Sequence, residues 1–263
     1  MHDSIVRLWL NLNSYVNSIR SGRRPPRQLL PELIAEFTLN EEIPQLQWYL
    51  NDIKVGGLQW TTRSRWWNQK KVERRANGYY KQTDTFLYDA LDEFPLRGKD
   101  VVIVGSEMPW YECICTHYGA RVTTLEYRDV DCRIPSLTVM TPEVFARSPG
   151  RFDVAFSISS IEHDGLGRYG DPINPVGDLR AMNEFKDLLK PNGLLILSVP
   201  VGRDVIVWNA HRIYGPRRFP MLLDGWTIVA SYGFQDSCFQ AQLGDYSCQP
   251  VFVLKANDNS CSA

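Results

Sequence analysis

The sequence predicts a Rossmann-like α/β fold: an open, mostly parallel sheet with helices on both faces, preceded by a mostly helical N-terminal extension. Two observations predict the sheet. From about residue 96, short apolar segments rich in β-branched residues alternate with segments of helical periodicity. A glycine follows the first apolar segment, and an acid follows the second about twenty residues later. We therefore divide the chain into an extension, residues 1–95, and a Rossmann-like domain, residues 96–263.

The extension begins with apolar residues at helical spacing from Ile5 to Ile19, which predicts an amphipathic helix. The run Ser21–Arg27 combines glycine, prolines and arginines, so we interpret it as an exposed basic linker, with a phosphate or partner contact as the alternative. Further helices are predicted at Pro31–Phe37, Ile43–Leu50 and Asp84–Phe94.

Aromatic and basic residues are interleaved between Trp60 and Tyr80. Such a pattern can stack on bases and neutralise phosphates, but it can equally cover a substrate cleft. The formal net charge of the chain is −1 and we find no nucleic-acid-binding motif, so nucleic acid is not the expected partner. We predict that this segment is a lid over the active site.

The Rossmann-like domain contains elements that alternate as a parallel sheet requires. The predicted strands are Asp100–Gly105, Arg121–Glu126, Phe152–Ser159, Leu194–Val199, Trp226–Ala230 and Gln249–Leu254. The predicted helices are Trp110–Tyr118 and Asp178–Leu189, and Pro191–Gly193 is the predicted turn between the second helix and its strand.

Ligands of such sheets bind beyond the carboxyl ends of the strands, which selects the loops after three of them. Gly105 would let the backbone approach a ligand, and the Glu126 carboxylate could accept hydrogen bonds from both ribose hydroxyls of a nucleoside. The first loop has one glycine, so a dinucleotide fingerprint is absent and S-adenosylmethionine is the expected cofactor. A solvated acid is the alternative for Glu126. The predicted cofactor-binding residues are Gly105, Ser106, Glu107, Glu126, Tyr127 and Ser159.

Several segments resemble known proteins. Leu188–Pro200 resembles the helix, turn and strand seen across class I methyltransferases. Val104–Glu112, Ser159–His163, Gly167–Pro172 and Asn209–Tyr214 resemble an uncharacterised family catalogued as domain of unknown function 268, and the resemblance covers about residues 84 to 255. The resemblance implies a class I S-adenosylmethionine-dependent methyltransferase sheet, without a substrate.

The loop after the strand at Phe152 carries the predicted catalytic pair, Glu162 and His163. His163 would take the proton of an acceptor hydroxyl, because an imidazole ordinarily titrates near neutral pH. The predicted substrate-binding residues are Arg168, Tyr169, Asn209 and His211, whose side chains suit a small polar or sugar-like acceptor, or a glycan. The alternative is a structural hydrogen-bond network that holds the long loop after Glu162, formed by Arg168, Tyr169, Asp171, Asn209, Arg212 and Tyr214.

One feature argues against a metal and another against catalysis. Some methyltransferases bind a divalent metal through the pattern E-x-x-E-H, but Ser159 occupies the position of its first Glu. We therefore expect no metal, with Glu162, His163 and His211 as the alternative ligand set. Glu107 would repel the cofactor's carboxylate, so the second hypothesis is a catalytically inactive methyltransferase-like module for binding or scaffolding.

The six cysteines are scattered, which predicts free thiols in a reducing compartment. No stretch approaches eighteen apolar residues and no signal-peptide pattern is present, so we expect no membrane span and a cytoplasmic location. The sequence gives no prediction of the oligomeric state.

Overall fold

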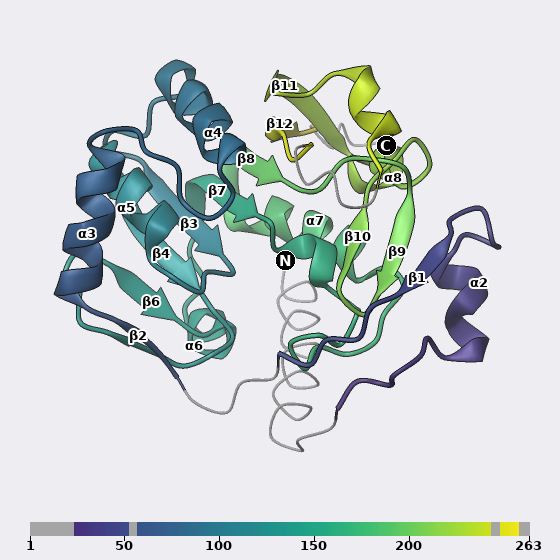
Figure 1. The fold of residues 1–263 in the computed structure, drawn as a ribbon. Helices are drawn as coiled ribbons and strands as arrows, with labels where there is room; N and C mark the ends of the chain where they lie inside the picture. The colour runs from purple at the N-terminus through teal and green to yellow at the C-terminus, as the bar shows by residue number, and fades with distance from the viewer. Residues whose placement is uncertain (1–23, 53–56, 243–247, 258–263) are drawn as a thin grey trace, which may run out of the picture.

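The computed structural model describes residues 24–52, 57–242 and 248–257 (Figure 1). Seven strands of these residues form the central sheet in the order β11-β12-β8-β7-β3-β4-β6, and β12 alone runs antiparallel to the others. This is an open, mostly parallel sheet within a Rossmann-like α/β fold, so the predicted fold class is confirmed. The strands are β3 (Asp100–Val104), β4 (Arg121–Leu125), β6 (Thr138–Met140), β7 (Phe152–Ile158), β8 (Leu189–Ser198), β11 (Trp226–Tyr232) and β12 (Val251–Ala256).

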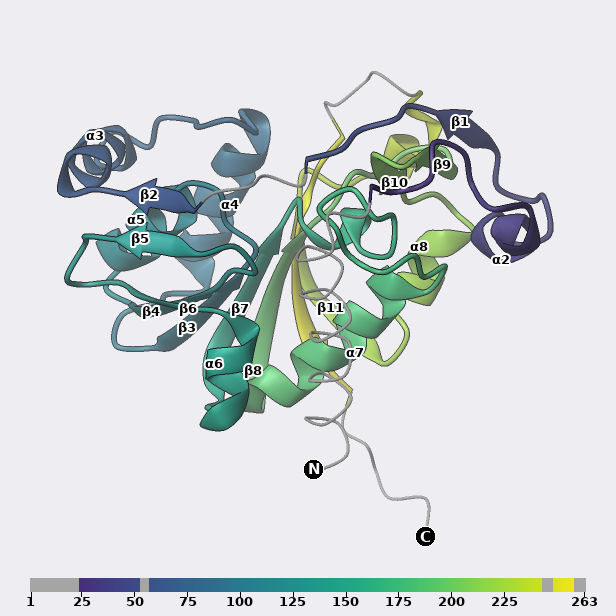
Figure 2. The same cartoon turned by 90° about the horizontal axis from the view of Figure 1, so that it is seen from below.

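Helices cover both faces of this sheet (Figures 1 and 2). One face carries α4 (Gln82–Glu93) and α5 (Trp110–His117), and α3 (Thr62–Val72) packs on α5. The other face carries α6 (Pro142–Arg147), α7 (Gly177–Leu188) and α8 (Arg218–Leu222).

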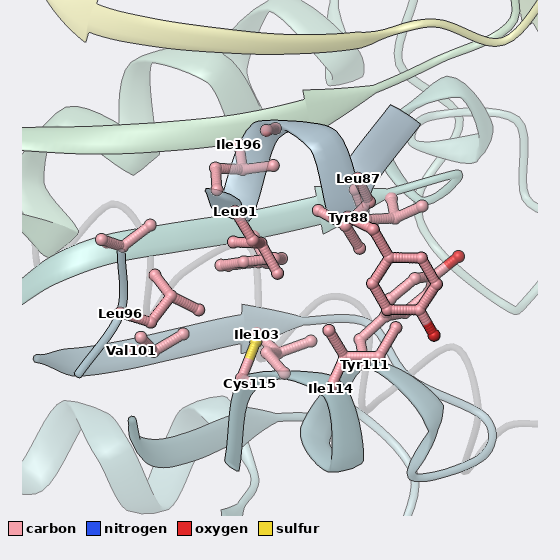
Figure 3. Packing of buried hydrophobic residues seen from close by; sticks show 14 of the residues in the cluster. Leu87, Tyr88, Leu91, Leu96, Val101, Ile103, Tyr111, Ile114, Cys115 and Ile196 are labelled. Carbon is pink, nitrogen blue, oxygen red and sulfur yellow. The ribbon is translucent and has the colours of Figure 1, made fainter. Parts of the chain in front are cut away.

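Alternate residues of the central strands enter opposite cores. Figure 3 shows Val101 and Ile103 of β3 packed with Leu91 of α4 and Ile114 of α5. Val102, between them in the chain, belongs to the other core. The continuously apolar strands of the sequence are therefore explained by burial on both faces.

A smaller sheet lies beside the main one and brings the N-terminal extension to it (Figure 2). It consists of β1 (Gln45–Gln47), β9 (Val205–Trp208) and β10 (His211–Ile213), with β1 parallel to β9. The predicted helix Ile43–Leu50 is therefore wrong, because pairing with a strand 160 residues away overrides the local pattern. A second pairing joins β2 (Leu58–Trp60) to β5 (Val130–Cys132).

Other predicted elements differ in smaller ways. Pro31–Phe37 is helical as predicted, as the 3₁₀ turn η1 (Pro31–Leu33) followed by α2 (Ile34–Phe37). The predicted turn Pro191–Gly193 lies inside β8, where Asn192 has φ of 63° and the pairing with β7 shifts register. The predicted helix at residues 5–19 and the first part of Ser21–Arg27 lie outside the described residues. The remaining short turns are η2 (Ile161–His163) and η3 (Asp236–Gln240).

Two cysteines correct the prediction of free thiols. Cys238 at η3 and Cys248 before β12 form a disulfide, with their Cα atoms 5.8 Å apart. The fold brings them together across a ten-residue separation that shows no disulfide signal in the sequence. Cys113 and Cys115 are free and buried, as expected of small apolar residues.

Candidate functional site

A cavity of about 1690 Å³ opens at the carboxyl ends of β3, β4 and β7. The order of the strands reverses here, since β4 lies on one side of β3 and β7 on the other. All but one of the predicted site residues line it, namely Gly105, Ser106, Glu107, Glu126, Tyr127, Ser159, Glu162, His163, Arg168, Tyr169 and His211. The cavity thus brings together residues predicted from four separate loops.

The loop after β3 begins with a glycine that the geometry requires. Gly105 has φ of +74°, and a Cβ at this position would lie 2.5 Å from Ser160 Oγ. The next backbone N–H, that of Ser106, donates a hydrogen bond of 2.9 Å to Glu126 Oε2. The loops after β3 and β4 are therefore joined directly at the cavity.

Glu126 is only 6% exposed, and an arginine that sequence reasoning missed lies beside it. Arg128 donates to Glu126 Oε1 from its backbone N at 3.1 Å and from Nε at 3.3 Å. The same guanidinium pairs with Glu107 Oε1 at 3.2 Å. Glu107, expected to repel a carboxylate, thus shares the positive charge of Arg128 with Glu126. The only sequence signal was a base two residues after the acid that ends the strand.

The loop after β7 holds a buried acid. Ser159 has φ of +50°, a conformation that L-residues rarely adopt, and its Oγ donates to Glu162 Oε1 at 2.5 Å. Glu162 is 1% exposed, and this burial raises its pKa to about 7 despite the bond from Ser159. Its Oε2 is buried without a hydrogen-bond partner among the described residues. Glu162 can therefore hold or release a proton near neutral pH.

His163 lies next to this acid, with Nε2 3.7 Å from Glu162 Oε1. Its Nδ1 is 2.6 Å from the carbonyl of Ala210, which assigns the proton to Nδ1 and leaves Nε2 as an acceptor. Burial, and then the charge of Arg168, lower the pKa of His163 to about 3. The expectation that this imidazole titrates near neutral pH is therefore wrong.

Aromatic rings and an ion pair line the cavity next to His163. Tyr169 contacts the His163 ring edge to face at 5.5 Å between centroids, and the Arg168 guanidinium lies over the Tyr169 ring at 4.9 Å. Arg168 Nε donates to Asp52 Oδ2 at 2.8 Å. The rings of His211 and His163 lie 6.3 Å apart between their centroids, and burial lowers the pKa of His211 to about 4. Both histidines are neutral at pH 7.

Several neighbouring polar residues form the structural network that was the alternative interpretation. Asn209 does not line the cavity, because its carboxamide accepts from Leu50 N and donates to Leu50 O, both at 2.8 Å. Asp171 Oδ2 accepts from the backbone N–H groups of Gly165 and Gly167. Arg212, fully buried, donates to the carbonyl of Asp164.

The N-terminal extension supplies further lining residues that sequence reasoning missed. Trp48, Asp52 and Tyr80 all line the cavity. The first two reach it through the pairing of β1 with β9, a long-range contact without a local signal. Glu112 of α5 is a further buried acid, although it does not line the cavity: it accepts from Thr124 Oγ1 at 2.9 Å, and burial raises its pKa to about 7.

Glu162, His163 and His211 are the alternative metal ligands that the sequence suggests. Among residues 24–52, 57–242 and 248–257, no group of three or more His, Cys, Asp or Glu side chains is arranged to hold a metal ion. In the same ranges, no helix is long and apolar enough to cross a membrane.

Comparisons with known proteins agree with the sequence on the family. The family model described as "Caenorhabditis protein of unknown function, DUF268" matches residues 98–247. No curated protein matches the chain.

Among solved structures, the Burkholderia thailandensis 1,6-didemethyltoxoflavin-N1-methyltransferase, with bound 1,6-didemethyltoxoflavin and S-adenosylhomocysteine, is similar at 17% identity and a TM-score of 0.49, covering 68% of this chain and 78% of that one. The N-methyltransferase NodS from Bradyrhizobium japonicum WM9 is similar at 15% identity and a TM-score of 0.45, covering 71% of this chain and 96% of that one. Similarities at this level establish neither an activity nor a substrate for this chain.

Proposed function

The chain belongs to the family described as "Caenorhabditis protein of unknown function, DUF268", and we propose that it is an S-adenosylmethionine-dependent methyltransferase acting on an oxygen of a small polar or sugar-like acceptor. One observation carries the proposal. Glu126, suited to a nucleoside, and Glu162 with His163, suited to a hydroxyl, line the same cavity at the switch point of the sheet.

The residues at the ends of β3 and β4 fit this cofactor. Glu126 is buried, and its Oε2 accepts a hydrogen bond from Ser106 N, which leaves capacity for a ribose hydroxyl. Tyr127 beside it would contact the adenine, and the Gly105–Ser106 backbone with Arg128 would hold the amino-acid end. When bound, S-adenosylmethionine supplies an electrophilic methyl group.

The acceptor hydroxyl would be held by Glu162 and His163. Nε2 of neutral His163 can accept a hydrogen bond from the acceptor hydroxyl and so orient the hydroxyl oxygen. Glu162, with its pKa of about 7, is the stronger base of the two, so the proton would finally reside on its carboxylate. Arg168, Tyr169 and His211 would contact the rest of the acceptor.

We propose that the extension of residues 1–95 precedes the Rossmann-like domain of residues 96–263 as a separate region, and that its described residues from 48 to 80 form a lid and wall of the cavity. The support is that Trp48, Asp52, Tyr79 and Tyr80 line the cavity although they precede the domain. Asp84 Oδ2 accepts from Gly78 N at 2.6 Å, which fastens the loop that carries both tyrosines to α4.

Isothermal titration with S-adenosylmethionine and S-adenosylhomocysteine tests the cofactor assignment. We expect micromolar binding by the wild type and at least about 30-fold weaker binding by Glu126→Ala, since two hydrogen bonds to a charged group are lost. Asp187→Ala, which removes an exposed acid on α7, is the control and should bind as the wild type does. An absence of binding up to millimolar ligand would favour the inactive module instead.

A further inference from the structure

The cavity has room for the cofactor and an acceptor together. Pockets for one drug-sized ligand are about 300–1,000 Å³, whereas this one is about 1690 Å³. The residues suited to the cofactor and to the reacting hydroxyl lie at the ends of β3, β4 and β7. The wall formed by residues 48–52 extends the cavity beyond them.

This wall is held firmly in place. Trp48 N donates to the carbonyl of Trp208 at 2.5 Å, and the Leu50 backbone is bound on both sides by the Asn209 carboxamide. Asp52 N donates a hydrogen bond to the carbonyl of Arg168 at 2.9 Å, and the Asp52 carboxylate accepts one from Arg168 Nε. Hydrogen bonds thus fix the wall to β9 and to the loop that carries the acceptor-facing residues.

Trp48 is the prominent apolar group of this wall. Its side chain lines the cavity, remains 48% exposed and touches the His211 ring at 6.2 Å between centroids. The exposed part of this indole is apolar area that a ligand bound in the cavity can cover. The contact with His211 makes Trp48 continuous with His163, two rings away.

The chemistry around Trp48 suits an uncharged, hydroxyl-rich ring. The two histidines are neutral, and the charges of Asp52 and Arg168 offset one another while presenting both acceptors and donors. The C–H face of a sugar ring packs on an indole, and its hydroxyls bond to mixed donors and acceptors of this kind. A polyanion is less suited, since residues 48–52 contain one acid and no base.

We propose that the acceptor is a glycan of at least two sugar units, and that Trp48 is the platform for the unit next to the one that is methylated. This inference rests on the proposed methyltransferase function for the placement of the reacting unit. Trp48 would act as a substrate-binding residue and determine the length of acceptor that binds.

The test uses the full chain saturated with S-adenosylhomocysteine on an array of neutral oligosaccharides of one to six units. We expect binding that is at least about tenfold tighter for the preferred sugar as a dimer or longer than as a monomer. Trp48→Ala should bind the longer glycans about tenfold more weakly than the wild type does, whereas Trp48→Phe should retain most of the affinity. Trp66→Ala is the matched control, because Trp66 is 53% exposed on α3 and does not line the cavity.

The outcomes separate the two proposals. The affinity for S-adenosylhomocysteine reports on the methyltransferase site. It should be the same in Trp48→Ala, Trp48→Phe and Trp66→Ala as in the wild type. Cofactor binding without oligosaccharide binding, or glycan binding unchanged in Trp48→Ala, overturns the glycan inference alone. Tight binding of a fluorescent twelve-residue oligouridine that Trp48→Ala abolishes would also overturn it, in favour of a nucleic-acid acceptor. Failure of cofactor binding in the wild type instead overturns the proposed function.

Discussion

Glu162, in the loop after β7, and Glu112, on α5, are carboxylic acids that the fold removes almost completely from water. Burial raises the pKa of each to about 7, so both retain protons that the unfolded chain has already lost. Between the ordinary pKa of a glutamate and pH 7, the folded state therefore binds more protons than the unfolded state. The free energy of unfolding consequently falls as the pH rises through this interval.

Glu162→Gln should remove this pH dependence at one site. The free energy of unfolding of the variant minus that of the wild type should rise between pH 5 and pH 7.5, by on the order of 3 kcal/mol. Urea unfolding at the two pH values measures it. Because the pKa of His163 is lower in the folded state than in the unfolded chain, both proteins lose stability as the pH falls below the unfolded pKa of this histidine. This contribution therefore largely cancels in the difference between the two proteins.

Asp187→Asn is the control for this measurement, because Asp187 is exposed on α7. Its difference from the wild type should not change with pH. A difference for Glu162→Gln that is equally independent of pH would show that Glu162 is ionised in the folded protein throughout this range.

Among the elements, those with local signals were predicted and those with long-range partners were not. β3 and β7 are buried on both faces, so their sequences are continuously apolar and identify them. β1 has no such signal, and two of its three residues are exposed. It is extended because it pairs with β9, and a periodicity argument cannot detect that partner.

The same distinction applies to the candidate site. Gly105, Glu126 and Glu162 were found because each follows a recognisable strand, and the ends of such strands are where ligands bind. Trp48 reaches the cavity only through the tertiary pairing of β1 with β9. The lowered pKa of His163 depends on burial and on the approach of Arg168, which likewise exist only in the fold.

Asn209→Ala should loosen the segment that follows β1. Asn209 is fully buried and binds both the N–H and the C=O of Leu50, so its removal leaves two backbone groups without these partners. We expect a loss of about 1–3 kcal/mol in the free energy of unfolding, with faster amide exchange at Leu50. Asn51→Ala, at an exposed neighbouring position, should change neither quantity. Unaltered exchange at Leu50 in Asn209→Ala would contradict the role given to this contact.

The Cys238–Cys248 disulfide and the predicted cytoplasmic location lead to opposite expectations, because disulfides persist mainly in oxidising compartments. We expect the disulfide to be present in protein purified without reductant. Mass spectrometry after alkylation should then show this pair unmodified, with Cys132 labelled. Cys238→Ala should lower the free energy of unfolding by about 2–3 kcal/mol for a loop of this length, whereas Cys132→Ala should have little effect. Labelling of both Cys238 and Cys248 before reduction would contradict the bond.

At the scale of the whole molecule, a buried cluster of charges fastens the small sheet to the main domain. Arg218 Nη2 of α8 forms an ion pair with Asp178 Oδ1 of α7 at 2.6 Å. Arg212 Nε of β10 lies 3.6 Å from Asp178 Oδ2. Tyr214 donates to the same carboxylate at 3.0 Å. Both arginines also donate to backbone carbonyls of the loop before α7. One carboxylate thus joins β10 of the small sheet to α7 and α8 of the Rossmann-like domain.

Asp178→Asn should weaken this junction strongly, because it leaves two buried arginines without their counter-charge. We expect a loss of about 3–5 kcal/mol in the free energy of unfolding, measured by urea denaturation. Arg217→Ala provides the contrast one residue from Arg218. Its ion pair with Glu42 is 65% and 53% exposed, so its loss should cost at most about 1 kcal/mol. If the two substitutions cost the same, the buried cluster would not be what joins the two sheets, and packing between them would have to account for the junction.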